Sequence, residues 1–173
     1  FRGTIYSTVE TKEIGELFML DAVRINAEKE QEDQLYTAQD VSLALSLWQT
    51  LKYHEPKDFG GFTLELFDAG HVLGSTMYKF SFPSGKSLMC TGDIGNSPSP
   101  LLKDVEKAEN LNYLLMESVY GDRNHEDRSE REEKFKLVVE QSIKRGGTLL
   151  IPAFSLERTQ IILSLLDDLF ESK

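Results

Sequence analysis

The chain has 173 residues, of which 40% are hydrophobic and 28% charged, a composition typical of a folded globular domain and not of a disordered segment. Its net charge of −10 argues against a protein that binds nucleic acid through a broad basic face, although carboxylates can still hold phosphate through bound cations. No apolar run approaches the roughly 18 residues of a membrane span, so we expect no membrane partner.

The length suits one medium domain, or one domain with part of another. A single cysteine, Cys90, excludes an internal disulfide, so we expect a cytoplasmic location. Phe1 is not followed by a secretory leader, and we expect the sequence to begin part-way along a longer protein.

The first clear helix signal follows a polar run at residues 28–34, which we interpret as a solvated loop or helix face. Thr37 and Asp40 have the spacing of a capping box, and Tyr36 and Val41 that of a hydrophobic staple. Apolar residues then recur at helical spacing, which predicts an amphipathic helix with Trp48 in the core. The apolar positions are Val41, Ala44, Leu45, Trp48 and Leu51.

Three strands are predicted next. Residues 62–68 and 76–82 alternate apolar with polar side chains, as half-buried strands do. Residues 88–90 form a short apolar run after a Pro-Ser-Gly turn. Residues 113–116 are continuously apolar, which predicts a strand buried on both faces, with Glu117 at its end.

The remainder predicts a parallel α/β unit in which helices and strands alternate. Ser129 and Glu132 form a capping box before an amphipathic helix, and Gly146 and Gly147 end that helix. Residues 148–151 are expected to be a buried strand. Ser155 is expected to cap the last helix.

The strongest chemical signals are His71 and Asp93, which both follow strand-like runs and lie beside glycines. Imidazole and carboxylate together suit zinc, manganese or iron. His71 is alternatively a structural residue, but the flanking glycines and nearby Asp68, which can accept its second ring N–H, favour a ligand. Asp93 is alternatively a turn aspartate. Glu117 is either a catalytic acid or a solvated strand-end charge.

Other reactive residues have weaker support. His125 lies in a charged loop, and His54 has no supporting context. Cys90 lies within an apolar strand and is expected to pack as a small hydrophobic residue. Ser75 has no histidine at a telling spacing, so a serine nucleophile is poorly supported.

Four motifs resemble the metallo-β-lactamase superfamily, in particular the β-CASP branch that processes nucleic acids. Residues 68–75 (Asp-Ala-Gly-His-Val-Leu-Gly-Ser) resemble its third metal motif, and residues 91–95 (Thr-Gly-Asp-Ile-Gly) its fourth. Residues 116–123 resemble the junction that opens the β-CASP insertion, and residues 146–160 its first strand and helix. Residues 1–8 are similar to the segment after the second metal motif.

The resemblance implies that His71 is a ligand of one metal ion and that Asp93 bridges two zinc ions. Glu117 becomes the acidic first motif of the β-CASP part, which pairs with a later histidine. Residues 1–119 are then the C-terminal part of an αββα metallo-β-lactamase domain, and residues 120–173 the start of a β-CASP domain. The implied chemistry is two-metal hydrolysis of phosphodiester bonds in single-stranded RNA.

The sequence departs from this family in lacking a His-x-His-x-Asp-His run, which supplies most of the metal ligands. We therefore expect an internal fragment of a zinc-dependent ribonuclease that binds metal weakly and is inactive alone. A DNA-directed nuclease of the same superfamily and a truncated, non-catalytic partner-binding module remain alternatives. Association into a homodimer also remains an open alternative.

Overall fold

The computed structural model describes residues 2–27, 35–96, 98–123 and 128–171. It contains helices and two sheets, which confirms the predicted α/β class. The chain divides into two compact units, Phe1–Glu117 and Ser118–Lys173. The polar run at 28–34 and His125 lie outside the described residues. Within them, no helix has both the length and the apolar character of a membrane span.

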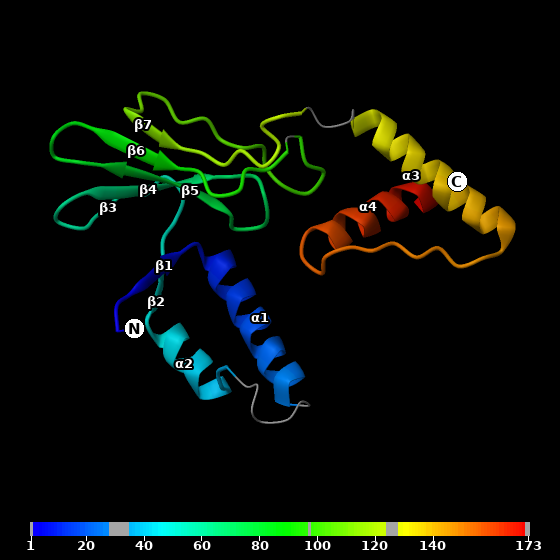
Figure 1. Ribbon diagram of the computed structural model, residues 1–173, viewed down its shortest axis with the longest axis horizontal. Helices are drawn as coiled ribbons and strands as arrows, with labels where there is room; N and C mark the ends of the chain where they lie inside the picture. Colours follow the sequence, from blue (N-terminus) through cyan, green and yellow to red (C-terminus); the bar gives the residue numbers. More distant parts are fainter. Residues whose placement is uncertain (1, 28–34, 97, 124–127, 172–173) are drawn as a thin grey trace. The chain divides into compact units, whose positions relative to one another are not determined.

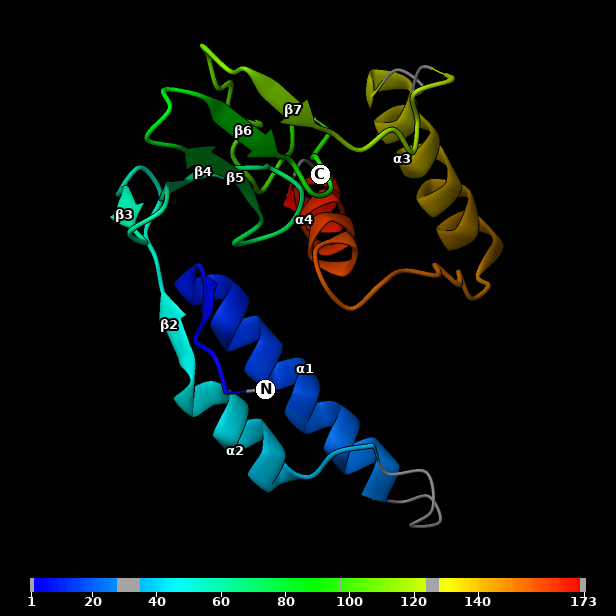
Figure 2. The same cartoon turned by 60° about the vertical axis from the view of Figure 1, so that its left-hand side comes forward.

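The first unit begins with a small parallel sheet and two helices that contact each other (Figure 2). Strand β1 (Ile5–Ser7) leads into helix α1 (Val9–Ala27), and α2 (Ala38–Ser46) leads into β2 (Trp48–Thr50). The two strands pair in parallel, and further bonds from Ile5 N to the Leu47 carbonyl (3.0 Å) and from Leu51 N to the Ser7 carbonyl (2.8 Å) extend the ladder.

Helix α2 begins where the sequence predicts but ends earlier. Thr37 Oγ1 accepts from Asp40 N at 3.3 Å, and Thr37 N donates to Asp40 Oδ2 at 2.8 Å, which completes the capping box. The predicted continuation of the helix through Leu51 is wrong, because Trp48 pairs with β1 instead. Trp48 is half-buried, and its Nε1 donates to Ser7 Oγ at 2.7 Å.

The main element of the first unit is a five-stranded sheet in the order β3-β4-β5-β6-β7 (Figure 1). Successive strands are antiparallel except for the last pair, β6 and β7, which is parallel. The three strands predicted between residues 62 and 90 are confirmed. The strands are β3 (Lys57–Asp58), β4 (Thr63–Asp68), β5 (Thr76–Ser81), β6 (Ser87–Cys90) and β7 (Tyr113–Leu115).

One buried cluster of this sheet lies under the loop that joins β6 to β7. Ala69, Met77 and Met89 are at most 3% exposed, and Val105 and Ala108 of that loop pack against them. Strand β7 is different, because all three of its residues are more than half exposed. The prediction that this strand is buried on both faces is therefore wrong for the described residues.

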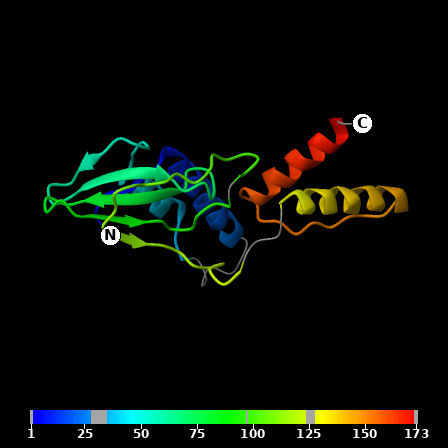
Figure 3. The same cartoon turned by 90° about the horizontal axis from the view of Figure 1, so that it is seen from above.

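The second unit consists of two helices joined by an extended segment (Figure 3). Helix α4 (Arg158–Glu171) lies within the stretch predicted to be helical. Helix α3 (Arg128–Arg145) ends before Gly146 as predicted but begins one residue before Ser129, so the prediction that Ser129 caps it is wrong. The predicted strand at 148–151 does not form in the described structure; residues 149–152 instead line an apolar groove with α3. Helix α4 begins at Arg158, so Ser155 is not its cap.

Candidate metal centre

The three residues that the sequence singles out lie at one end of the five-stranded sheet. Strands β4, β6 and β7 run in the same direction, since β4 and β6 are both antiparallel to β5 and β7 is parallel to β6. His71 follows the end of β4, Asp93 the end of β6 and Glu117 the end of β7. Loops at such strand ends commonly carry functional side chains, because the sheet fixes their positions.

His71 and Asp93 meet at this end of the sheet. His71 Nε2 lies 3.8 Å from Asp93 Oδ2, and the two side chains are 44% and 71% exposed. Two donors bound to one tetrahedral zinc ion are about 3.4 Å apart, given metal–ligand distances of about 2.1 Å. The observed separation is close to that value, so the pair can share a cation with a small adjustment.

Hydrogen bonds within the loop that carries His71 fix its backbone. Ser75 Oγ accepts from the backbone N–H of His71 at 3.0 Å and of Val72 at 3.2 Å. Asp68 Oδ1 accepts from Gly70 N at 2.8 Å. Asp68, suggested by the sequence as a partner for the His71 ring, thus caps the turn. Both side chains order the backbone on either side of His71.

Glu117 acts on the loop that carries Asp93. Its Oε1 accepts from the backbone N–H of Ile94 at 2.6 Å, and its own backbone N–H donates to Thr91 Oγ1 at 3.3 Å. A short hydrogen bond to a carboxylate is among the stronger neutral-to-charged contacts in proteins. The carboxylate of Glu117 therefore holds the residue next to Asp93. A direct catalytic role for Glu117 stays a prediction.

The two loops contact each other through glycine backbone. Gly95 N donates to the Ala69 carbonyl at 2.8 Å, and a Cβ on Gly95 would collide with the carbonyl group of Gly70. Gly70 itself has φ +62, in the left-handed region that favours glycine. His71 and Asp93 are thus brought together by a backbone approach that side chains at Gly70 and Gly95 would prevent.

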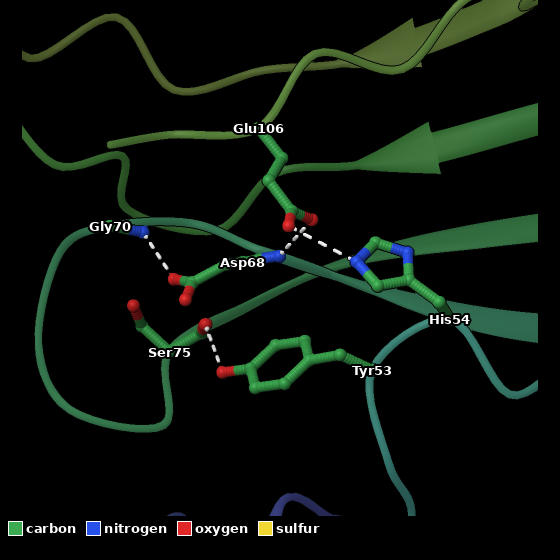
Figure 4. A network of polar contacts seen from close by, with 6 residues as sticks. All are labelled: Tyr53, His54, Asp68, Gly70, Ser75 and Glu106. Atoms are coloured by element: carbon green, nitrogen blue, oxygen red, sulfur yellow. Dashed lines mark hydrogen bonds and ion pairs between the residues drawn. The ribbon is translucent and has the colours of Figure 1, made fainter. Parts of the chain in front are cut away.

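A further network surrounds the start of the His71 loop (Figure 4). Glu106 contacts both the His54 ring (3.1 Å) and the backbone N–H of Asp68 (2.8 Å), and Tyr53 donates to the Ser75 carbonyl (3.0 Å). Burial raises the pKa of Tyr53 above its ordinary value, and the charges of Asp68, Glu10 and Glu106 add to this, so the phenol stays a donor.

Glu106 has no signal in the sequence that marks it as part of the site, and His54 has no supporting sequence context. The two residues lie 52 positions apart, and neither has a local motif that indicates the other. Only the packing of the β6–β7 loop against the sheet brings them together. No local pattern in the sequence was available to find this pair.

The chain supplies only part of a metal-binding set. Among the described residues, no group of three or more His, Cys, Asp and Glu side chains gathers as a metal site. Imidazole and carboxylate are nevertheless the donor types that zinc and related cations take in proteins. The pair fits as two ligands of a site that needs further ligands.

Comparison with known protein families identifies the fold to which this geometry belongs. Residues 1–105 match the model of the metallo-beta-lactamase superfamily domain. The chain belongs to the metallo-β-lactamase superfamily. The resemblance inferred from the motifs around His71 and Asp93 is thereby confirmed.

Several known proteins are similar to this chain over nearly its whole length. It is 32% identical over 97% of its length to the cleavage and polyadenylation specificity factor subunit 3 of Dictyostelium discoideum. It is 31% identical over 99% to the endoribonuclease YSH1 of Yarrowia lipolytica, and 34% identical over 97% to the cleavage and polyadenylation specificity factor 73 of Drosophila melanogaster. The chain spans only 21% to 24% of the lengths of these relatives.

Proposed function

We propose that this chain is an internal part of a metal-dependent ribonuclease of the β-CASP branch. The observation that carries the proposal is the meeting of His71 and Asp93 at 3.8 Å, at the end of the sheet of a metallo-β-lactamase superfamily member. On this proposal residues 1–119 belong to the metallo-β-lactamase domain and residues 120–173 begin the β-CASP domain.

The residues present fit a pair of zinc ions as a partial ligand set. His71 would supply its imidazole and Asp93 its carboxylate to the bound ions. Bound metal ions would polarise the phosphodiester and activate the attacking water. The chain's own contribution is to hold its two ligands side by side, through Ser75 and Glu117 on the two loops.

RNA is the proposed substrate because a relative that covers the chain is named an endoribonuclease. The net charge of −10 is compatible with this proposal when cations lie between the carboxylates and the phosphates. Single-stranded RNA and a cytoplasmic location stay predictions. A DNA-directed nuclease or a non-catalytic module would share the same sheet-end geometry.

The test is a pair of substitutions in the full-length gene product. We expect His71→Ala and Asp93→Asn each to lower the amount of bound zinc and to slow RNA cleavage by more than roughly a hundredfold. Loss of a residue that only hydrogen-bonds a metal ligand costs up to about that much, and loss of a ligand should cost more. Asp167→Asn, at an exposed position on α4, is the matched control. Unchanged metal content in both ligand variants would contradict the proposal, and cleavage of DNA alone would favour the alternative nuclease.

A further inference from the structure

Glu106 bonds to Asp68, the last residue of β4, which precedes the loop that carries His71. It lies on the β6–β7 loop, whose neighbouring residues Val105 and Ala108 pack against the buried cluster of the sheet. This packing places the Glu106 carboxylate at the end of β4 (Figure 4). The backbone that carries the Glu106 carboxylate is thus held in place by apolar packing, in addition to the polar contacts of the carboxylate.

Glu106 makes three hydrogen bonds, two with Asp68 at the end of β4 and one with His54. Its Oε2 accepts from Asp68 N at 2.8 Å, its backbone N–H donates to the Asp68 carbonyl at 3.0 Å, and its Oε1 lies 3.1 Å from His54 Nε2. The His54 ring also meets Phe67 edge to face, with ring centroids 5.3 Å apart. Both backbone groups of Asp68 therefore bond to one residue.

Asp68 in turn restrains the backbone just before His71. Its side chain accepts from Gly70 N at 2.8 Å, immediately before the histidine. Gly70 also lies close to the β6–β7 loop, because a Cβ at that position would be 2.9 Å from both the Lys103 carbonyl and Val105 N. The segment from Asp68 to Gly70 is thus held against the loop that carries Glu106.

We propose that Glu106 is a positioning residue that holds the His71 loop in its ligating arrangement, with His54 as the side chain that orients the carboxylate. The inference rests on the proposed metal-binding function of His71. On this proposal Glu106 is not itself a metal ligand. It fixes the backbone from which the imidazole is presented.

The test compares four variants of the full-length protein: Glu106→Ala, Glu106→Gln, His54→Ala and Glu109→Ala. Zinc and manganese affinities are measured by competition with a chelator. Amide hydrogen exchange is measured at Asp68 and Gly70, and at Met89 in the buried cluster as a reference for general unfolding. Glu109 is the matched control, since it is an exposed glutamate of the same loop.

We expect Glu106→Ala to speed exchange at Asp68 and Gly70 by roughly tenfold, with Met89 unchanged, because hydrogen bonds to a charged group are lost. Metal affinity should fall on the order of tenfold. Glu106→Gln should restore most of both values, because an amide oxygen can still accept from Asp68 N. His54→Ala should give a smaller loss, and Glu109→Ala none.

Two results would overturn the inference: exchange at Asp68 and Gly70 that does not change in Glu106→Ala, or faster exchange there with unaltered metal affinity. A wild-type protein that binds neither zinc nor manganese would contradict the proposed function itself. In that case the exchange rates at Asp68 and Gly70 still decide whether Glu106 holds the loop.

Discussion

The absence of a Cβ atom at Gly95 allows the loops of the two candidate ligands, His71 and Asp93, to approach each other. Gly95 and Gly70 approach so closely that even one methyl group on Gly95 would overlap the Gly70 carbonyl. Backbone cannot swing away as a flexible side chain can. A substitution here must therefore move one of the two loops, and with it either His71 or Asp93.

Gly95→Ala is expected to destabilise the first unit by about 2 kcal/mol, the usual cost of forcing extra volume into a packed site. It should also weaken zinc binding, since the loops separate. Urea unfolding and metal titration measure the two effects. Gly61→Ala is the control, because a Cβ at Gly61 meets no atom within 4 Å. Equal behaviour of the two alanine variants would show that the loop contact has no importance for the site.

At the scale of elements, local signals predicted the structure where the contacts are local. The start of α2 depends on Thr37 and Asp40, three residues apart, and the sequence identifies it correctly. The end of α2 depends on pairing between Trp48 and Ile5, 43 positions apart, and helical spacing of apolar residues gave the wrong boundary. Likewise, the apolar run at 148–151 predicts a strand, but it packs beside α3 with no strand partner among the described residues.

The cap of α2 gives a prediction at this scale. Thr37→Ala should destabilise α2 by about 1 kcal/mol at neutral pH, the typical cost of a lost N-cap. Hydrogen bonds from Thr37 hold the pKa of Asp40 below its ordinary value. The Asp40 contribution is therefore present above the unfolded-state pKa and disappears as the pH falls through the lower folded-state pKa.

The measurement is circular dichroism of wild type and Thr37→Ala, with urea, at neutral and acidic pH. The difference in stability between the two proteins should shrink in acid. Ser42→Ala is the matched control, because its hydroxyl bonds within the helix to the Ala38 carbonyl at 3.1 Å and not to the cap. A difference that is independent of pH would mean that the charge of Asp40 takes no part.

At the scale of the whole molecule, the sequence predicts the part of the candidate site that depends on residues directly following strands. His71, Asp93 and Glu117 each follow a strand, and the common direction of β4, β6 and β7 brings them to one end of the sheet. Glu106 and His54 belong to the same region but follow no strand pattern, so only the three-dimensional packing shows their connection. Every residue assigned to the site lies in the first unit.

The division into two units predicts that each responds to its own buried side chains. Met89 is 2% exposed in the first unit, and Val139 is 7% exposed in the second. Met89→Ala should lower the free energy of unfolding by roughly 2–5 kcal/mol and Val139→Ala by about 2 kcal/mol, because buried apolar surface is lost and cavities are left behind.

The measurements are amide exchange and metal affinity in the two variants. Amide exchange should rise in β4, β5 and β6 for Met89→Ala and in α3 for Val139→Ala. Metal affinity should fall only in Met89→Ala, because β4 and β6 carry the loops of His71 and Asp93; a loss of equal size in Val139→Ala would mean that the second unit also shapes the site.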